Sequence, residues 1–421
     1  MTQERAIELA LSGHNIFLTG KAGTGKSYTT NKIIEQMRKS GKSVAVTATT
    51  GIAATHIDGQ TIHSWTGIGI KEEVTDEMLF GLSRNRFTAD RMKIPDVLII
   101  DEISMLHDYR LDMVDEVLRF VRSSNEPFGG MQVIVVGDFH QLPPVNKNNK
   151  KNYTFNAKSW DALDFRVCYL EKIYRQSDEQ LIEVLNAIRE ARIEDRHRDI
   201  LNAALDNKHN ADKAINLYCK NKEVRFENEE CLAKVDSDLV TFKARTQGHE
   251  MAVKKITGSW NGEENLSLKV GAREMFLVNK YVQGGDVIFT NGQMGEVTEF
   301  IGDDAVIVKP YNGDPIVVTR HEWKLEEEDT SGKMRTVAKV LQIPLRLAYA
   351  ITIHKSQGSS FDYVNLDLSD AFTTNQGYVA LSRVRTLAGL NLIGYKYGSL
   401  LQDSTIVAKD REFYEASRGN E

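Results

Sequence analysis

Four short apolar runs in the first third of the chain constrain its fold more than any other feature. They cover residues 16–18, 44–48, 97–100 and 133–136, and each is bounded by Gly, Asp or Thr. The segments between them repeat apolar residues at helical spacing, as in NKIIEQMRK and LDMVDEVLRFV. Strands that alternate with helices predict a parallel sheet covered on both faces, hence an α/β fold. In such sheets a ligand lies beyond the carboxyl ends of the strands.

The size and composition indicate a soluble protein of several domains. A chain of 421 residues exceeds what one hydrophobic core usually supports, and 41% apolar with 27% charged residues is typical of globular proteins. No segment approaches the roughly 18 apolar residues of a membrane helix, and the first residues do not resemble a signal peptide. We therefore expect a cytoplasmic protein of a bacterial or phage host cell, not secreted and without a membrane partner. Three separated cysteines, Cys168, Cys219 and Cys231, indicate buried thiols rather than disulfides or a zinc site.

The middle of the chain changes character between residues 245 and 335. Gly-rich turns (QGGD, NGQMG, GDD, NGD) separate short β-rich pieces such as DVIF, GEVTEF, AVIVK and PIVVT. This pattern predicts a small β-barrel inserted into a second α/β domain. The predicted organisation is therefore a first domain at 1–150, a second at 151–244 and 336–421, and the inserted barrel at 245–335.

Residues 20–27 read GKAGTGKS and match the phosphate-binding pattern G-x-x-x-x-G-K-[ST]. The match follows the strand candidate IFLT and opens a helix candidate, which is the context that this loop requires. Its glycines let backbone N–H groups turn inward around phosphates at a helix N-terminus. Lys26 would bridge the β- and γ-phosphates, and the Ser27 hydroxyl would ligate Mg²⁺. The predicted cofactors are ATP and Mg²⁺, and the predicted binding residues here are Gly20, Gly23, Thr24, Gly25, Lys26 and Ser27.

Acidic and amide side chains follow two further strands. VLIIDEIS places Asp101 and Glu102 at the end of a buried run, where charges are costly unless they face a site. Asp101 suits the coordination of Mg²⁺, and Glu102 suits a general base that activates the attacking water. VIVVGDFHQLPPV ends in Gln141, which could bond the γ-phosphate or that water and report hydrolysis.

The order of these motifs resembles that of the Pif-one (petite integration frequency) helicases, in the RecD- and Dda-like branch of helicase superfamily one. The matching pieces run from near the N-terminus to about residue 395: FLTGKAGTGKS, VTATTGIAATHIDGQTIHSWTGIG, LIIDEISML, PFGGMQVIVVGDFHQLPPV, YLEKIYRQ, LAYAITIHKSQGSSFD and YVALSRVRTLAGL.

The resemblance implies two RecA-like domains with ATP held between them and 5′-to-3′ movement on DNA in replication, recombination and repair. Gln3 would recognise adenine, and Arg175 and Arg383 would be arginine fingers that reach the γ-phosphate from the second domain. Hydrolysis would thereby couple to opening and closing between the domains. Residues 66–93 resemble a strand-separating wedge, although a long surface connection would look the same.

For DNA, the resemblance points to small hydroxyl, amide and basic groups in three motifs. Such donors suit sequence-independent contacts with the phosphodiester backbone and are compatible with the net charge of −6. Single-stranded DNA and forked or tailed duplexes are the expected partners, with the protein acting as a monomer, and G-quadruplexes and RNA–DNA hybrids stay open as substrates. The predicted DNA-binding residues are Thr49, Thr50, Gly51, His63, Ser64, Thr352, His354, Lys355 and Gln357.

Several readings stay open from the sequence. The run KNNKKN at 147–152 could be a basic surface or a solvated loop, and Trp65 and Phe139 could stack on bases or pack in the core. Lys220 and the stretch GAREMFLVNK depart from the family pattern. A single-strand clamp that does not unwind DNA would use the same motifs, whereas a small-molecule kinase would explain the phosphate loop and little else.

Overall fold

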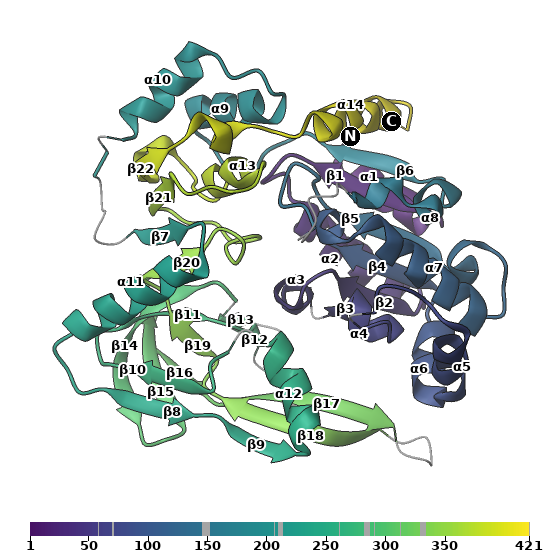
Figure 1. Ribbon diagram of the computed structural model, residues 1–421, viewed down its shortest axis with the longest axis horizontal. Helices are drawn as coiled ribbons and strands as arrows, with labels where there is room; N and C mark the ends of the chain where they lie inside the picture. Colours follow the sequence, from purple (N-terminus) through teal and green to yellow (C-terminus); the bar gives the residue numbers. More distant parts are fainter. Residues whose placement is uncertain are drawn as a thin grey trace. The chain divides into compact units, whose positions relative to one another are not determined.

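The computed structural model divides the chain into two compact units, which are drawn together in Figure 1. Unit 1 comprises residues 1–210 and 360–421, and unit 2 comprises residues 211–359. The structure describes residues 1–57, 59–69, 71–144, 152–205, 207–208, 214–260, 262–281, 287–289, 291–311, 313–328 and 334–420. Within these residues, no helix combines the length and the apolarity that crossing a membrane requires.

Unit 1 alternates strands and helices along its first 170 residues, as the sequence predicts. Its elements are α1 Gln3–Leu11, β1 Ile16–Gly20, α2 Lys26–Lys39, β2 Val44–Ala48, α3 Gly51–His56, β3 Gln60–Thr61, α4 Ile62–Thr66, α5 Asp76–Arg84, α6 Arg86–Lys93, β4 Val97–Asp101, α7 Asp108–Val121, β5 Gln132–Val136, α8 Lys158–Ala162, β6 Arg166–Leu170, α9 Glu179–Arg189, α10 Asp195–Ala203, β21 Val364–Leu368, α13 Gln376–Leu381, β22 Leu390–Tyr395 and α14 Ser404–Arg418.

Six strands of unit 1 form one parallel sheet in the order β3-β2-β4-β5-β1-β6. Alternate residues of each strand enter two cores: Phe17 of β1 packs on one face, and Ile16 and Leu18 pack on the other. Helices α1, α2 and α3 supply buried side chains to the second core, and α7 and α14 supply them to the first. Both faces are therefore covered, and the carboxyl ends of β1, β2, β4 and β5 meet at one edge.

The C-terminal helix belongs to this packing. Ile406 and Phe413 of α14 lie in the core that also holds Phe17 and Trp160. The two compact units divide at residues 210 and 359, and this division does not test the predicted domain boundaries at 150, 244 and 335. Those boundaries stay a prediction.

Within the segment 66–93, residues 76–84 and 86–93 form the helices α5 and α6. Met78 and Leu79 of α5 and Ala89 and Met92 of α6 are buried in the first core of unit 1. The two helices are thus anchored to the sheet domain through their apolar faces.

Unit 2 is mostly antiparallel. Its elements are β7 Ile215–Tyr218, α11 Asn221–Lys234, β8 Val240–Lys243, β9 Arg245–Gly248, α12 Glu250–Ser259, β10 Asn265–Leu268, β11 Arg273–Phe276, β12 Lys280–Tyr281, β13 Val287–Phe289, β14 Met294–Ile301, β15 Ala305–Pro310, β16 Ile316–Thr319, β17 His321–Glu328, β18 Met334–Gln342, β19 Leu345–Leu347 and β20 Ala350–Thr352. A five-stranded sheet has the order β16-β15-β14-β11-β19, β17 and β18 pair with β9, and β20 pairs with β7 in parallel.

The strands expected between 245 and 335 are confirmed, and their closure into a barrel stays a prediction. The turn QGGD lies outside the described residues, since 282–286 are not described. Unit 2 has a core of its own around Phe242, Leu266, Phe276 and Val306.

Candidate functional site

The loop GKAGTGKS joins β1 to α2 at the carboxyl edge of the parallel sheet. Gly20, Gly23 and Gly25 all have positive φ, and Gly25 is the left-handed N-cap of α2. This conformation turns successive N–H groups toward one point in front of the helix, which is the geometry of an anion-binding nest. The Lys26 ammonium lies over the same loop and donates to the carbonyl oxygens of Gly20 (2.9 Å) and Lys21 (3.1 Å).

Two glycines of the loop are required by close approach. A Cβ on Gly23 would lie 2.6 Å from the Cβ of Arg175, and one on Gly25 would lie 2.3 Å from Nε2 of Gln3. The Gln3 amide donates to the carbonyl of Thr24 at 3.1 Å. The predicted adenine-recognising Gln and one predicted arginine therefore both contact the loop.

The acidic pair stands at the end of β4. Asp101 is buried, and its carboxylate accepts from the backbone N–H of Glu102 at 2.8 Å. Burial and the neighbouring Glu102 charge raise the pKa of Asp101. Glu102 has a left-handed φ of 54°, which turns its side chain away from the strand direction. Two carboxylates in this position create a negative potential that a cation would relieve.

Asp138 and Gln141 follow β5 and are both buried. Asp138 is held by Arg189 of α9, whose Nη1 lies 2.8 and 2.9 Å from the two carboxylate oxygens. Nη2 of the same guanidinium is 2.8 Å from Asp410 of α14. Burial alone would raise the pKa of Asp138, but the charges of Arg189 and Lys26 outweigh it and lower that pKa.

Arg383 lies close enough to Arg175 for the charge of the Arg175 guanidinium to act on it. Burial and the Arg175 charge lower the pKa of Arg383 to about 9, and burial also lowers the pKa of Arg175. Arg383 is only 1% exposed. The Glu102 charge acts on both arginines and on Lys26, so unit 1 brings the predicted catalytic groups Lys26, Glu102, Arg175 and Arg383 together.

Arg189 and Tyr378 also contact this site, and no sequence motif indicated either residue. The Tyr378 hydroxyl accepts from the N–H of Ala22 in the phosphate loop (3.1 Å) and from Arg189 (3.2 Å). The partners of Arg189 lie 51 and 221 residues away along the chain, so no local pattern could reveal them.

The predicted DNA-binding residues of unit 1 fall into two groups. Thr49 is 7% exposed, and its hydroxyl donates to the carbonyl of Glu102 at 2.9 Å, while the Thr50 hydroxyl caps α3, which begins at Gly51. His63 and Ser64 lie on α4, where Ser64 is exposed and its carbonyl accepts from Arg91 of α6 at 2.7 Å. Burial, with Arg110 nearby, lowers the pKa of His63 to about 4, so that the imidazole is neutral at pH 7.

The remaining predicted DNA-binding residues lie in unit 2, at and after the end of β20. Thr352 and Gln357 are buried, whereas His354 and Lys355 are half-buried. The Thr352 hydroxyl accepts from the N–H of Lys355 at 3.3 Å and so closes the turn that carries the basic side chain. Burial lowers the pKa of both His354 and Lys355.

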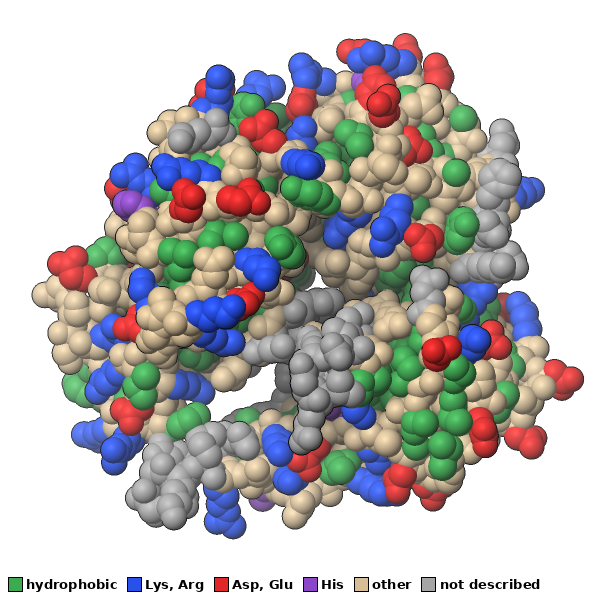
Figure 2. Space-filling view, turned by 180° about the vertical axis from the view of Figure 1, so that it is seen from behind, with side chains coloured by type: hydrophobic (Ala, Val, Ile, Leu, Met, Phe, Trp, Pro, Cys, Tyr) green, Lys and Arg blue, Asp and Glu red, His purple; other side chains and the backbone are tan. Residues whose placement is uncertain are grey.

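The aromatic residues are packing residues rather than base platforms. Trp65 is 4% exposed within the first core. Phe139 is 5% exposed and packs against Phe17 and Phe155. In KNNKKN, residues 147–151 lie outside the described residues. On the face drawn in Figure 2, Lys and Arg side chains are interspersed with Asp and Glu rather than gathered into one field.

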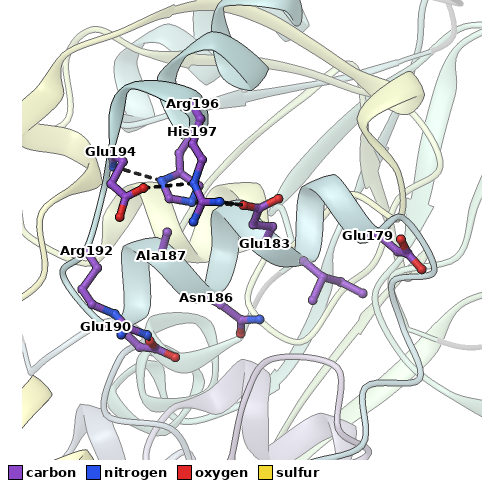
Figure 3. A pocket seen from close by; sticks show the side chains of 10 residues that line it. Glu179, Glu183, Asn186, Ala187, Glu190, Arg192, Glu194, Arg196 and His197 are labelled. Atoms are coloured by element: carbon purple, nitrogen blue, oxygen red, sulfur yellow. Dashed lines mark hydrogen bonds and ion pairs between the residues drawn. The ribbon is translucent and has the colours of Figure 1, made fainter.

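A pocket of about 540 Å³ between α9 and α10 lies away from all predicted site residues (Figure 3). Several of its charged side chains pair with one another: Glu183 lies 3.3 Å from Arg196 and 3.5 Å from His197, and Arg192 pairs with Glu190. A second cavity, of about 730 Å³, is lined by Gln3, Thr24 and Tyr174 beside the phosphate loop. This second cavity adjoins the predicted nucleotide site, because Gln3 and Thr24 belong to both.

The chain is similar to known proteins over nearly its whole length. Residues 3–199 match the family model of PIF1-like helicases, and residues 347–390 match the UvrD-like helicase C-terminal domain. The ATP-dependent DNA helicase Pif1 of a Psychrobacter species is 37% identical in an alignment that covers 99% of this chain and 71% of that protein. The chain belongs to the PIF1-like helicase family. The Pif1 helicase of Bdellovibrio bacteriovorus is 33% identical, with 98% and 91% covered.

Solved structures of PIF1-like helicases have the same fold. The crystal structure of Candida albicans Pif1 matches with a TM-score of 0.83 at 31% identity, covering 97% of this chain and 98% of that one. A Bacteroides Pif1 in complex with ADP-AlF4 matches with a TM-score of 0.82 at 32% identity, covering 99% and 97%. The fold of this PIF1-like chain is therefore α/β with two RecA-like domains, as the sequence predicted.

Proposed function

We propose that the chain is an ATP-dependent DNA helicase that moves 5′-to-3′ on single-stranded DNA and separates forked or tailed duplexes. The observation that carries the proposal is the charge arrangement of unit 1. The charge of Arg175 acts on both Lys26 and Arg383 beside an anion-binding loop, and burial together with that charge lowers the pKa of Arg383 to about 9. A triphosphate is the ligand that would stabilise three such cations together.

The residues in this arrangement suit distinct steps of hydrolysis. The loop residues and Lys26 would hold the phosphates, Gln3 and the cavity beside Tyr174 would hold the adenosine, and Glu102 would take the proton of the attacking water. Gln141 would orient that water. Arg175 and Arg383 would stabilise the charge that develops on the transferred phosphoryl group.

Mg²⁺ fits the donor set at the start of α2. Ser27 is exposed there, and burial together with the neighbouring Glu102 charge raises the pKa of Asp101, an effect that a divalent cation beside the two carboxylates would oppose. When bound, the ion would neutralise charge on the β- and γ-phosphate oxygens. Hard oxygen donors of this kind are those that Mg²⁺ prefers.

DNA contacts are proposed at two places. In unit 1, the exposed Ser64 and the neutral His63 of α4 are suited to donate hydrogen bonds to phosphate oxygens, with Thr50 and Gly51 at the start of α3. Thr49 would act through its bond to Glu102, because its hydroxyl is already engaged. In unit 2, His354, Lys355, Thr352 and Gln357 would contact the backbone of the same strand.

The helix pair α5–α6 is the proposed wedge. Its apolar face is anchored in the core, and Arg91 ties it to the carbonyl of Ser64. Phe80 of α5 is 54% exposed and meets Phe120 edge to face at 5.5 Å. An exposed aromatic side chain on an anchored helix pair is suited to pack against the end of a duplex.

The testing experiment measures ATP hydrolysis with and without single-stranded DNA, alongside unwinding of duplexes with a 5′ or a 3′ tail. DNA-stimulated hydrolysis with unwinding only from the 5′ tail is expected. Stimulation without unwinding would favour a clamp, and hydrolysis that ignores DNA would refute the proposal. Action in the cytoplasm as a monomer and on G-quadruplexes belongs to the same proposal, and light scattering and quadruplex unwinding assays test the last two.

A further inference from the structure

Asn375 occupies the N-cap of α13 in a conformation that side chains other than glycine rarely adopt. Its φ is 73° and its side chain is fully buried. An N-cap Asn normally accepts from the first free N–H groups of its own helix, but Asn375 makes no such bond. Its Nδ2 instead donates to the carbonyl oxygens of Phe139 (3.2 Å) and Gln141 (2.9 Å). The amide is therefore directed at the segment that carries the predicted γ-phosphate sensor.

The other end of α13 orients Arg383. The Nε of Arg383 donates to the carbonyl of Val379 at 2.9 Å, and its Nη2 donates to the Ser382 hydroxyl at 2.9 Å. The carbonyl of Ser382 in turn accepts from Nη1 of Arg175 at 3.3 Å. Both arginines thus take their position from the last turn of this helix.

The middle of α13 contacts the phosphate loop through the hydroxyl of Tyr378, which accepts from the N–H of Ala22 at 3.1 Å. All six residues of the helix are buried. Such a short, enclosed helix moves as one piece, so a displacement at Asn375 is transmitted to Arg383.

We propose that Asn375 is a positioning residue that couples Gln141 to Arg383. It would place the side-chain amide of Gln141 and the guanidinium of Arg383 at the γ-phosphate at the same time. The inference rests on the proposed ATP hydrolysis. Asn375 itself touches neither nucleotide nor DNA in this scheme. It acts by fixing the backbone of Gln141 relative to the helix that ends at the arginine.

Two substitutions distinguish the effect of the Asn375 side-chain amide from the effect of its backbone conformation. Asn375→Gly removes the amide while glycine keeps the positive φ, and Asn375→Asp keeps the shape but turns a carboxylate oxygen toward two carbonyl oxygens. For Asn375→Gly we expect kcat for DNA-stimulated hydrolysis to fall about 10-fold, the scale of two lost buried hydrogen bonds. For Asn375→Asp we expect a larger fall. In both variants the KM for ATP and the affinity for a fluorescent ATP analogue should stay within about 2-fold of wild type.

The matched control is Asn207→Ala. Its Nδ2 also donates to backbone carbonyls of unit 1, those of Leu387 (3.2 Å) and Leu390 (2.9 Å), away from the Gln141 segment. Wild-type kcat is expected for this variant. If Asn375→Gly also turns over as wild type does, or loses nucleotide affinity together with kcat, the inference is wrong while the helicase proposal stands. If the wild-type chain does not hydrolyse ATP, both fail.

Discussion

Arg189 offers the sharpest test of how unit 1 is held together. Its guanidinium is 2% exposed and lies 2.8 Å from carboxylate oxygens of both Asp138 and Asp410. It also donates to the hydroxyls of Tyr169 (3.1 Å) and Tyr378 (3.2 Å). One side chain thus joins β6, the end of β5, α13 and α14.

Arg189→Met keeps most of the volume and removes the charge and all five N–H donors. Asp138 then remains fully buried without its main counter-charge, and breaking a buried ion pair in this way costs about 3–5 kcal/mol of unfolding free energy. Urea denaturation measures the loss. The control Arg411→Met removes an exposed arginine next to Asp410, and it should change stability by less than about 0.5 kcal/mol.

The loss should depend on pH. In the wild type, the Arg189 charge opposes burial and holds the pKa of Asp138 and Asp410 below their usual values. Without Arg189, burial raises the pKa of Asp138 in the folded state above its unfolded value. The folded variant then binds more protons, so its stability falls as pH rises, and the loss should be larger at pH 8 than at pH 5. A loss equal to that of Arg411→Met at both pH values would refute the reasoning.

Three further predictions concern the site and unit 2. Glu102→Gln should abolish ATP hydrolysis and retain ATP binding in a fluorescent-nucleotide titration. Lys26→Ala should also abolish hydrolysis, and full turnover in either variant would exclude the role assigned to that residue. Arg383→Ala should lower kcat by roughly 10³-fold or more with nucleotide affinity largely kept, and normal unwinding would contradict this. Glu274 of β11 is fully buried, neither of its carboxylate oxygens has a hydrogen-bond partner among the described residues, and burial raises its pKa well above the usual range. Since ionisation costs stability only in the folded state, wild-type stability falls as pH rises from about 4.5. Glu274→Met should therefore raise the free energy of unfolding by about 1–3 kcal/mol at pH 8 and by less at pH 5, as measured by urea denaturation; an equal gain at both pH values would show that the carboxyl group does not titrate as inferred.

The sequence determined the elements and the order of the motifs. The four apolar runs became β1, β2, β4 and β5, and the phosphate loop joins a strand to a helix as its pattern requires. These features could be predicted because strand and helix periodicity and loop chemistry are written in a few consecutive residues. The parallel sheet then brought Lys26 and Glu102 to one edge, since the carboxyl ends of its strands coincide.

Only the tertiary structure decided which polar groups hold that edge in place. Asn375 reaches the carbonyl of Gln141 across 234 residues, and Arg189 reaches Asp410 across 221. It also showed that the Thr49 hydroxyl, predicted to contact DNA, is engaged with the backbone of Glu102. A buried donor must find an acceptor wherever packing supplies one, and packing joins residues without regard to their separation along the chain. Local patterns therefore determine where the site forms, and long-range hydrogen bonds determine how its groups are aligned.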